Sequence, residues 1–363
     1  MSDNKRTPLY PFHEKLKARF VPFGGWDMPV SYTKILEEHT CVRKGLGLFD
    51  VSHMGEALVE GEEASEFLNY LITNDIDSMT DGKALYSPMC SEDGNVIDDV
   101  ISYRYNKNKY FICLNASNTD KDIAWMEKNL GNFKCTVKNC SDEYGQIAIQ
   151  GPRSLPFLNE LFDFDMNHEI PRFHFKEIEI EGTLCIVSRT GYTGEDGCEI
   201  YIPTDKTLAV TEYIFEKGKS HNLTPIGLGA RDSLRLEVGY PLYGHEISDA
   251  INPLKAGLGW CVKLKKEANF IGKENLTKEK EAGLTEKVIF YTLDDKRIAR
   301  QDTPVLQNDK PIGKVLSGTF SPVINKPIGS ALVKTADLDT GNLFFDLRGN
   351  KVALKVARPP LHK

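Results

Sequence analysis

The spacing of hydrophobic residues predicts short helices and strands in mixed order along the first 280 residues. A period of 3.6 residues indicates an amphipathic helix, and a period of two indicates a strand with one buried face. Helical spacing recurs in residues 33–44, 62–73, 119–131, 152–162, 205–218 and 229–238. Strand character is found in residues 48–61, 83–90, 96–105, 109–117, 147–151, 174–191 and 197–203. Strands mixed with helices, without regular parallel alternation, predict an α+β architecture.

The pattern changes after residue 284. Residues 286–359 contain almost only short strand candidates divided by turn dipeptides, which predicts a small β-barrel or sandwich. The stretch KEKEAG at residues 278–283 is the best candidate for a linker between the two regions.

Composition places the chain among globular proteins. With 363 residues, 40% hydrophobic and 27% charged, it is long enough for two or three domains and is neither disordered nor membrane-like in composition. No apolar run approaches the roughly 20 residues of a spanning helix, and the polar N-terminus lacks the apolar core of a signal peptide. A cytoplasmic location is therefore expected, without a membrane partner.

Charge and cysteines exclude further classes. A net charge of −7 without a long basic run argues against nucleic-acid binding. Lys15, Lys17 and Arg19 could form a local basic patch, although a solvated face is the more ordinary explanation. The eight cysteines are scattered without a C-x-x-C pair, so we expect reduced, mostly buried thiols and no metal site.

Familiar cofactor and nucleophile motifs are missing from the sequence. It has no Walker loop, no G-x-G-x-x-G after an opening strand, no G-x-S-x-G and no H-E-x-x-H. Glycines and charges gather instead in residues 188–201 and 227–246, where backbone can approach a flat ligand closely.

Arg231 is the first candidate for ligand binding. It follows Gly227 and Gly229 in the first turn of a predicted helix, where a carboxylate is favoured by the helix N-terminus and by the guanidinium. The alternative is an internal ion pair with Asp232, Glu237 or Glu199, and the residues alone favour that alternative.

Asp98 and Asp99 form a second candidate site. They lie in the middle of a predicted strand, so their side chains point to opposite faces and only one can enter a given cleft. A carboxylate buried in a cleft has a raised pKa, which suits proton transfer or the orientation of an amine. An edge strand with both acids in solvent or paired with lysines is the equally weighted alternative.

Histidines and tyrosines are weaker candidates. His53 and His245 are candidate acid–base groups because free imidazole titrates near neutrality, but lone histidines beside strands are more often hydrogen-bonded structural residues, so neither is assigned a catalytic role. Four tyrosines could stack on an aromatic ligand, Tyr86, Tyr192, Tyr240 and Tyr243, whereas packing is the ordinary role of most of the 14 tyrosines.

Nine segments in the same order resemble glycine cleavage T-proteins. They are TPLYPFHEKLKARFVPFGGWDMPVSY, GLFDVSHMGE, KALYSPM, GNVIDDVISY, IAIQGP, GYTGEDGCEIY, GLGARDSLRLEVGYPLYGHEI, NPLKAGLGW and FIGKENL. The resemblance runs from about residue 7 to the C-terminus. It implies a three-domain, cloverleaf-like folate-binding fold of mixed α/β domains with a C-terminal small β-barrel. The expected boundaries are 1–280 for two interleaved α+β domains, the second at roughly 52–138, and 284–363 for the barrel.

The resemblance also implies roles for particular residues. The first acid of the family's I-D-D motif falls on Asp98, which is expected to be the catalytic carboxylate, with Asp99 facing away. Glu199 and Arg231 match folate-binding positions. The same folate cavity would be lined by Tyr86, Asn115, Tyr192 and Tyr240, with Met54 and Val100 as apolar walls. Many relatives end in an aromatic P-F-Y-like tail, whereas this chain ends RPPLHK, so no C-terminal site is expected.

The activity implied is that of an aminomethyltransferase. Such an enzyme moves a one-carbon unit from an aminomethyl group on a lipoylated H-protein to tetrahydrofolate, which is a substrate here, with no metal and no flavin. Two alternatives within the superfamily are a folate-dependent demethylase of a methylated amine and a folate-binding iron–sulfur assembly factor. The second carries a K-G-C-Y-x-G-Q-like motif where this chain has NFIGKENL, which favours the enzyme.

Overall fold

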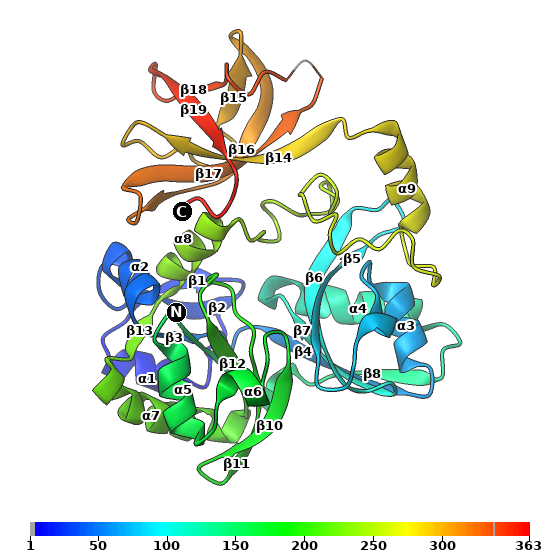
Figure 1. Cartoon of the computed structure of the whole chain (residues 1–363), viewed down its shortest axis with the longest axis vertical. Helices are drawn as coiled ribbons and strands as arrows, with labels where there is room; N and C mark the ends of the chain where they lie inside the picture. The colour runs from blue at the N-terminus through cyan, green and yellow to red at the C-terminus, as the bar shows by residue number, and fades with distance from the viewer. Residues whose placement is uncertain (1–3, 337) are drawn as a thin grey trace. The chain divides into compact units, whose positions relative to one another are not determined.

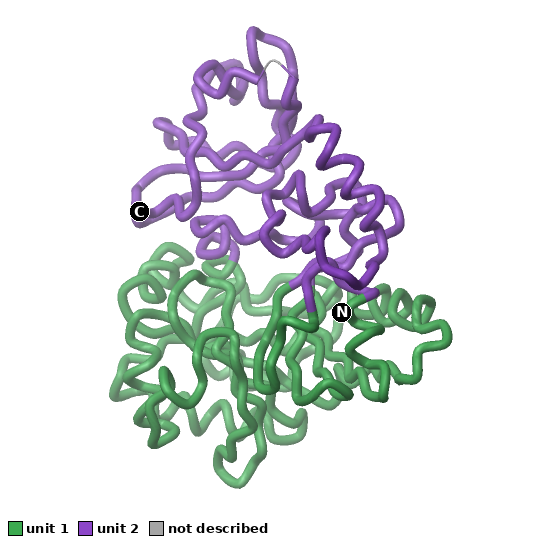
Figure 2. Tube along the Cα trace, turned by 45° about the vertical axis from the view of Figure 1, so that its right-hand side comes forward, with its two compact units in different colours: residues 1–69, 76–86, 100–231 green, residues 70–75, 87–99, 232–363 purple. Residues whose placement is uncertain are grey.

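The computed structural model describes residues 4–336 and 338–363. Figure 2 shows that the chain forms two compact units, each assembled from separate stretches of sequence. Unit 1 contains the chain up to Asn69 together with Ile76–Tyr86 and Val100–Arg231. Unit 2 contains Tyr70–Asp75, Ser87–Asp99 and the chain from Asp232 onward. Within the described residues, no helix combines the length and apolarity needed to cross a membrane.

A six-stranded sheet lies in unit 1. Its spatial order is β10-β11-β12-β9-β3-β13, and every pair is antiparallel except β3 with β13. The strands are β3 (Gly47–Asp50), β9 (Tyr144–Gln150), β10 (Phe175–Ile180), β11 (Thr183–Ser188), β12 (Gly197–Pro203) and β13 (Thr224–Ile226). The predicted hairpin is confirmed: Glu181 and Gly182 join β10 to β11 with φ of 48° and 70°, as a type I′ turn requires.

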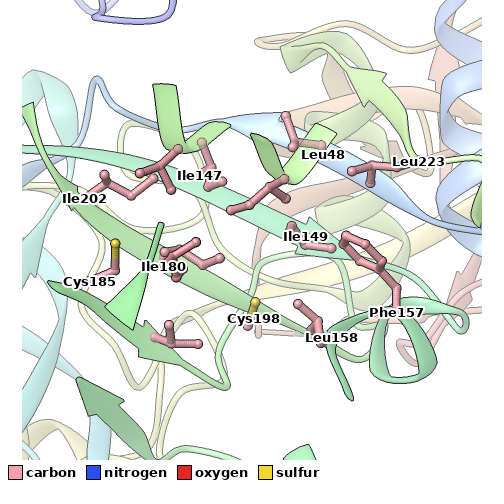
Figure 3. Packing of buried hydrophobic residues seen from close by; sticks show 14 of the residues in the cluster. Leu48, Ile147, Ile149, Phe157, Leu158, Ile180, Cys185, Cys198, Ile202 and Leu223 are labelled. Carbon is pink, nitrogen blue, oxygen red and sulfur yellow. The ribbon is translucent and has the colours of Figure 1, made fainter. Parts of the chain in front are cut away.

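An apolar core covers one face of this sheet. Ile147 and Ile149 of β9 and Cys198 of β12 pack there against helices α5 (Ser154–Phe162) and α7 (Thr207–Gly218), as Figure 3 shows for the strands and for α5. Each fully buried aliphatic side chain contributes about 1.5–3 kcal/mol. Because side chains alternate along a strand, the residues between these core positions face the other way and are available for a binding site.

A second sheet has the order β5-β6-β7-β4-β8. Its strands are β4 (Gly55–Gly61), β5 (Ala84–Cys90), β6 (Val96–Asn106), β7 (Lys109–Leu114) and β8 (Cys135–Asn139). Helices α3 (Ala64–Leu71) and α4 (Thr119–Leu130) accompany it, and α4 packs on β4 and β8, in the cyan region of Figure 1. The predicted meander over β5, β6 and β7 is confirmed, and β4 is inserted between β7 and β8.

The single strand predicted over residues 48–61 is wrong. β3 ends at Asp50, and a turn closed by a 3.0 Å hydrogen bond from the Met54 amide to the Val51 carbonyl separates it from β4. Both flanking segments alternate in hydrophobicity, so the pattern runs through the turn. The two strands then join different sheets.

The start of the chain contains elements that hydrophobic spacing does not predict. Helix α1 (Tyr10–Lys15) precedes a hairpin of β1 (Arg19–Phe23) and β2 (Trp26–Ser31), followed by the predicted helix α2 (Ile35–Lys44). Glu38 of α2 accepts hydrogen bonds from the amides of Tyr32 and Thr33, both 2.6 Å, and from the amide of Gly227 at 2.8 Å. This buried carboxylate therefore ties the hairpin to the segment that leads into the next helix.

A closed six-stranded barrel in unit 2 confirms the β-rich C-terminal region. The order around the barrel is β14-β17-β16-β15-β18-β19. The strands are β14 (Glu286–Leu293), β15 (Pro304–Gln307), β16 (Lys310–Ser321), β17 (Lys326–Lys334), β18 (Phe344–Asp346) and β19 (Lys351–Ala357). Fully buried Tyr291, Val305 and Phe345 fill its interior. Closure pairs every strand on both edges, which removes the exposed edges of an open sheet.

The proposed linker KEKEAG is helical. It forms the last turns of helix α9 (Lys273–Ala282), which ends where Gly283 takes a positive φ of 85°. Leu276 anchors the helix in the small core of unit 2 that includes Cys90 and Phe270. The remaining helices are α6 (Met166–Glu169) and α8 (Leu228–Val238).

A buried ion pair in unit 2 links α8 to the barrel. The guanidinium of Arg235, 1% exposed, donates hydrogen bonds to Glu246 at 2.7 Å, to Asp232 at 2.9 Å and to Ser317 at 2.9 Å. Ser330 donates a further hydrogen bond to Glu246. Although burial alone raises the pKa of Glu246, Arg235 and the hydroxyl donors outweigh it and lower that pKa.

Candidate functional site

Glu199 is positioned on the face of the six-stranded sheet opposite the apolar core. Its neighbours Cys198 and Ile200 enter that core, so alternation along β12 turns Glu199 the other way. The Thr190 hydroxyl donates a 2.5 Å hydrogen bond to one carboxyl oxygen, and the side-chain amide of Gln146 donates a 3.4 Å bond to the other. Burial raises the pKa of Glu199, while the Thr190 hydrogen bond and the charge of Arg231 oppose that rise.

Buried hydroxyl groups support the Glu199–Thr190 contact. The hydroxyl groups of Tyr103 and Tyr201 lie 2.9 Å apart, and that of Tyr103 is 3.5 Å from Thr190. Thr190 also lies 3.0 Å from the hydroxyl of Ser188. Both tyrosines are fully buried. Because these groups satisfy one another, the Glu199 carboxyl group is held in a defined orientation before any ligand arrives.

Arg231 lies in the first turn of α8. Gly227 and Gly229 allow that turn to come close to its neighbours: a Cβ at Gly227 would lie 2.3 Å from the carbonyl oxygen of Val30, and one at Gly229 would lie 2.5 Å from Ile35. The two glycines singled out in the sequence are therefore needed for close packing of the helix N-terminus. This packing fixes the position of the backbone from which the Arg231 side chain extends.

The guanidinium of Arg231 stacks on Tyr192 instead of entering an ion pair. Its centre lies 4.7 Å from the ring centroid, a cation–π distance. Of the three acids considered as its ion-pair partners, Asp232 pairs with Arg235 at 2.8 Å and Glu237 accepts from Ser321. The charge of Arg231 acts on Glu199, but the two form no ion pair within the described residues. Half-buried Arg231 thus keeps its N–H donors for another acceptor.

The turn between β3 and β4 places Met54 beside Asn115. Gly55 sits so close to Thr119 that a Cβ there would lie 2.2 Å from the Thr119 hydroxyl. That hydroxyl donates to the carbonyl of Asn115 at 3.3 Å. Met54 and Asn115, both half-buried, therefore come from adjacent turns of unit 1.

Asp50, which sequence reasoning did not single out, anchors the beginning of this turn. Its carboxylate accepts hydrogen bonds from Thr7 at 2.7 Å and from the Ser52 amide at 2.8 Å, and His13 lies 2.8 Å away. Burial alone would raise the pKa of Asp50, but these hydrogen bonds lower it. The signal was present in the sequence, since an acid within a fully hydrophobic strand needs buried partners.

Asp98 and Asp99 lie on opposite faces of β6, as alternation predicts. Asp98 is fully buried and Asp99 half-buried, and the buried positions continue with Val100 and Ser102. The alternative with both acids in solvent is wrong, because β6 is an inner strand and one of the two carboxyl groups has left water. Asp98 belongs to the part of β6 in unit 2, and Val100 to the part in unit 1.

The remaining candidates differ in exposure and partners. Tyr86 is half-buried on β5 in unit 1, and Tyr240, 38% exposed, follows α8 in unit 2. His245 donates a 2.9 Å hydrogen bond to the Leu316 carbonyl, as expected for a structural histidine. Among the described residues, His53 has no hydrogen-bond partner on either ring nitrogen. Unit 1 thus holds Met54, Tyr86, Val100, Asn115, Tyr192, Glu199 and Arg231, and unit 2 holds Asp98 and Tyr240.

The thiols and a shallow pocket add no chemistry to this arrangement. All eight cysteines are free, and every one but half-buried Cys41 is buried, which agrees with the prediction of mostly buried thiols. A pocket between the β10–β11 turn and α7, lined by Thr183, Lys206 and Tyr213, contains none of the candidate residues. In the described part of the chain, no three His, Cys, Asp or Glu side chains gather as metal ligands would.

Comparisons with known proteins agree along nearly the whole chain. Residues 9–266 match the family described as GCVT N-terminal domain, and residues 287–363 match the glycine cleavage T-protein C-terminal barrel domain. Aminomethyltransferases of Desulfitobacterium hafniense and Alkaliphilus oremlandii are 45% and 48% identical, and each alignment covers 98% of this chain and 97% or 96% of the relative. An aminomethyltransferase of Listeria welshimeri is 47% identical over 100% of this chain and 99% of its own.

A solved structure has the same fold. The glycine cleavage system aminomethyltransferase T from Bartonella henselae superposes with a TM-score of 0.91 at 33% identity, covering 98% of both chains. The two alternatives considered from the sequence are not favoured by these relatives. The fold and the collinear segments, together with these relatives, show that the chain belongs to the glycine cleavage T-protein family of aminomethyltransferases.

Proposed function

We propose that this aminomethyltransferase transfers a one-carbon unit from the lipoyl arm of an H-protein to tetrahydrofolate, with Asp98 as its catalytic residue. Folate would be bound by Glu199, Arg231 and the side chains of Tyr86, Tyr192, Tyr240, Asn115, Met54 and Val100. The proposal depends on two residues of unit 1. Glu199 is already held in place by Thr190, and Arg231 stacks on Tyr192 without an ion-pair partner among the described residues.

Reduced folate has the groups that this pair recognises. Its pterin ring carries amino and ring N–H donors, which suit the carboxyl group of Glu199. Its acidic end suits Arg231, whose guanidinium can bind a carboxylate with two parallel hydrogen bonds. Tyr192, already stacked on Arg231, and half-buried Met54 provide apolar surface for a flat ring.

The reaction exchanges bonds at a single carbon. In the donor, this carbon is bonded to the lipoyl sulfur and to an amino group. The carbon–nitrogen bond breaks to release ammonia, the carbon–sulfur bond breaks to release the thiol, and two new bonds join the carbon to two folate nitrogens. The protons lost by those nitrogens pass to the departing amine and to the sulfur, so atoms and charge balance.

Asp98 suits the step in which positive charge develops. Loss of ammonia leaves positive charge shared between the carbon and the lipoyl sulfur, and a carboxylate close to it would stabilise that charge. The same carboxylate can orient the attacking folate nitrogen and accept its proton, contributions of a kind that typically amount to about 10²–10⁴-fold in rate. Full burial of Asp98 keeps competing water away from the carboxyl group. We place the reaction in the cytoplasm, where eight free thiols stay reduced.

A donor comparison tests the proposal. Purified protein is incubated with tetrahydrofolate and either aminomethyl-loaded H-protein or dimethylglycine, and methylenetetrahydrofolate and ammonia are measured. We expect both products from the loaded H-protein alone. The dimethylglycine arm is run with and without an added electron acceptor, because its methyl carbon reaches the methylene level only by a two-electron oxidation, and methyltetrahydrofolate is measured as well. Either folate product from dimethylglycine would identify a demethylase and refute the proposal.

The variant Asp98→Asn tests the assignment of the carboxylate. Single-turnover rates should fall about 100-fold or more, while the folate dissociation constant changes less than about threefold, because the group acts on developing charge rather than on ground-state binding. Asp99→Asn, on the opposite face of β6, is the matched control and should keep near-normal rates. Equal rates for wild type and Asp98→Asn would remove Asp98 from the mechanism.

A further inference from the structure

His53 is buried with both polar ring atoms unpartnered. It is 1% exposed, and neither Nδ1 nor Nε2 has a hydrogen-bond partner among the described residues. Buried His13, in contrast, is bonded: it lies 2.8 Å from both Asp50 and the Tyr32 hydroxyl. An unpaired buried donor or acceptor costs free energy, so folded proteins rarely retain one without a reason.

The backbone around His53 is fixed on both sides. The amides of Ser52 and Met54 are bonded to Asp50 and Val51, at 2.8 and 3.0 Å. The hydroxyl of Ser52 both donates to and accepts from the backbone of Gln146, at 3.0 Å each. These bonds hold the backbone from which the imidazole extends in one conformation, and the ring itself is buried.

The surroundings of the ring belong to the proposed folate site in unit 1. Phe23 meets the imidazole edge to face, with ring centroids 5.6 Å apart. The adjacent Gly24 lies against Ala116 and Ser117, so the β1–β2 turn connects His53 with the segment that begins at Asn115. Next to His53 in the chain is Met54, and the charge of Arg231 reaches the imidazole.

The ring is uncharged at physiological pH. Burial and the positive charge of Arg231 lower the pKa of His53 to about 3, and Asp50 only partly opposes them. A neutral imidazole has one N–H donor and one acceptor nitrogen. It therefore cannot act as a cation for a carboxylate, but it can recognise a neutral polar edge.

We infer that His53 is a further folate-binding residue, whose neutral imidazole exchanges hydrogen bonds with a neutral polar edge of the folate bound in unit 1. This inference rests on the proposed function. The ligand class is a reduced pteridine with donors and acceptors side by side, and the bound ligand satisfies nitrogens that the protein leaves unpaired. His53 in this role binds substrate and carries out no proton transfer.

Two substitutions separate binding from packing. His53→Phe keeps the ring and removes both nitrogens, whereas His53→Gln keeps a donor and an acceptor. For the full chain we expect His53→Phe to weaken tetrahydrofolate binding about tenfold, with partial recovery in His53→Gln. The thermal midpoint without folate should be unchanged or higher in His53→Phe, because a buried unpaired polar group is removed.

His245→Phe is the matched control. Its imidazole is bonded to the Leu316 carbonyl, so the same substitution should lower the thermal midpoint and leave the folate dissociation constant within about twofold. Calorimetric titration with tetrahydrofolate, under reducing conditions, and thermal unfolding without ligand give the two readouts. A His53→Phe variant that binds folate as wild type does, or that loses binding together with its thermal midpoint and is not rescued by glutamine, overturns the inference.

Arg231→Ala distinguishes failure of this inference from failure of the proposed site. Weakened binding in Arg231→Ala with normal binding in His53→Phe removes His53 alone. Normal binding in both variants removes the whole site and the inference with it. A contrary result would be a dissociation constant of the wild type that rises as the pH is raised from about 6 to 7 while that of His53→Gln stays constant. Such a result would show that a charged imidazole binds folate, and it would overturn the neutral contact.

Discussion

Two arginines one turn apart on helix α8 occupy opposite environments. Arg235, 1% exposed, has its guanidinium surrounded by Glu246, Asp232 and Ser317. Half-buried Arg231 stacks on the face of Tyr192 and forms no ion pair within the described part of the chain. The same residue type, in the same helix, is saturated with partners at one end and offers its donors to a ligand at the other.

The difference shows how to distinguish a structural charge from a binding one. A buried charge with every hydrogen bond satisfied contributes to the folded state, and removing its partner leaves an uncompensated charge. A charge whose donors lack protein partners contributes little to folding and is available to a ligand. The following experiments separate the two kinds.

Arg235→Ala should have the largest effect. It leaves the buried carboxylate of Glu246 without its cation, so the free energy of unfolding should fall by about 3–5 kcal/mol. Urea unfolding near neutral pH measures it, with Lys15→Ala, an exposed residue, as control. A loss below about 1 kcal/mol would mean that the two arginines do not differ in the way described.

Arg231→Ala should reverse the pattern. We expect the tetrahydrofolate dissociation constant to rise about 30- to 100-fold, corresponding to about 2–3 kcal/mol for hydrogen bonds to a charged group. The unfolding free energy without ligand should change by less than about 1 kcal/mol. An unchanged dissociation constant in a titration would contradict the assignment of Arg231 to folate.

His53 is a neutral buried group without hydrogen-bond partners among the described residues, and its effect on stability depends on pH. Its folded pKa of about 3 lies below the ordinary 6.5, so the unfolded chain binds a proton below pH 6.5 that the folded chain does not. Folded stability is therefore lost as pH falls from 6.5 towards 3. At about pH 5 this effect lowers the free energy of unfolding of the wild type by about 2 kcal/mol, and the variant His53→Gln should not show it. Unfolding of both proteins at about pH 8 and pH 5 measures this difference, and parallel pH dependence would refute it.

Thr190→Val should have the smallest effect. Valine keeps the shape but removes the hydroxyl that donates to Glu199, so folate binding should weaken about three- to tenfold, near 1 kcal/mol. Turnover at saturating folate should stay within about twofold. Thr190→Ser retains the hydroxyl and should bind nearly as wild type does. Equal loss in both variants would point to packing instead.

Regular elements could be predicted where hydrophobic spacing and turn residues agree. The helix at 119–131, the hairpin around Glu181 and the β-rich end were all found this way. The β1–β2 hairpin escaped prediction because β1 is mostly exposed and each strand contains a proline, a residue that argues against a strand. The KEKEAG segment looked like a linker because it is mostly charged, whereas Leu276, the buried residue that anchors helix α9, precedes it.

Only part of the candidate site could be predicted from the sequence. Alternation correctly separated Asp98 from Asp99, because that rule needs no tertiary information. The residues alone favoured an ion pair for Arg231, because its acidic neighbours in the sequence look equally available to it. The structure gives Asp232 to Arg235 and Glu237 to Ser321, and such competition depends on which side chains the fold brings together.

The close approach of Gly55 to Thr119 restricts the order in which this region can change over evolution. A methyl group on the Cα of residue 55 would come within 2.2 Å of the Thr119 hydroxyl, so no side chain fits at 55 while a threonine stands at 119. Because the Thr119 Cβ itself would lie 2.9 Å away, only glycine at 119 would clear the space, and that change would remove the hydroxyl bonded to Asn115. Each single step is blocked by its neighbour, so the two positions are expected to stay together or to drift only as a pair.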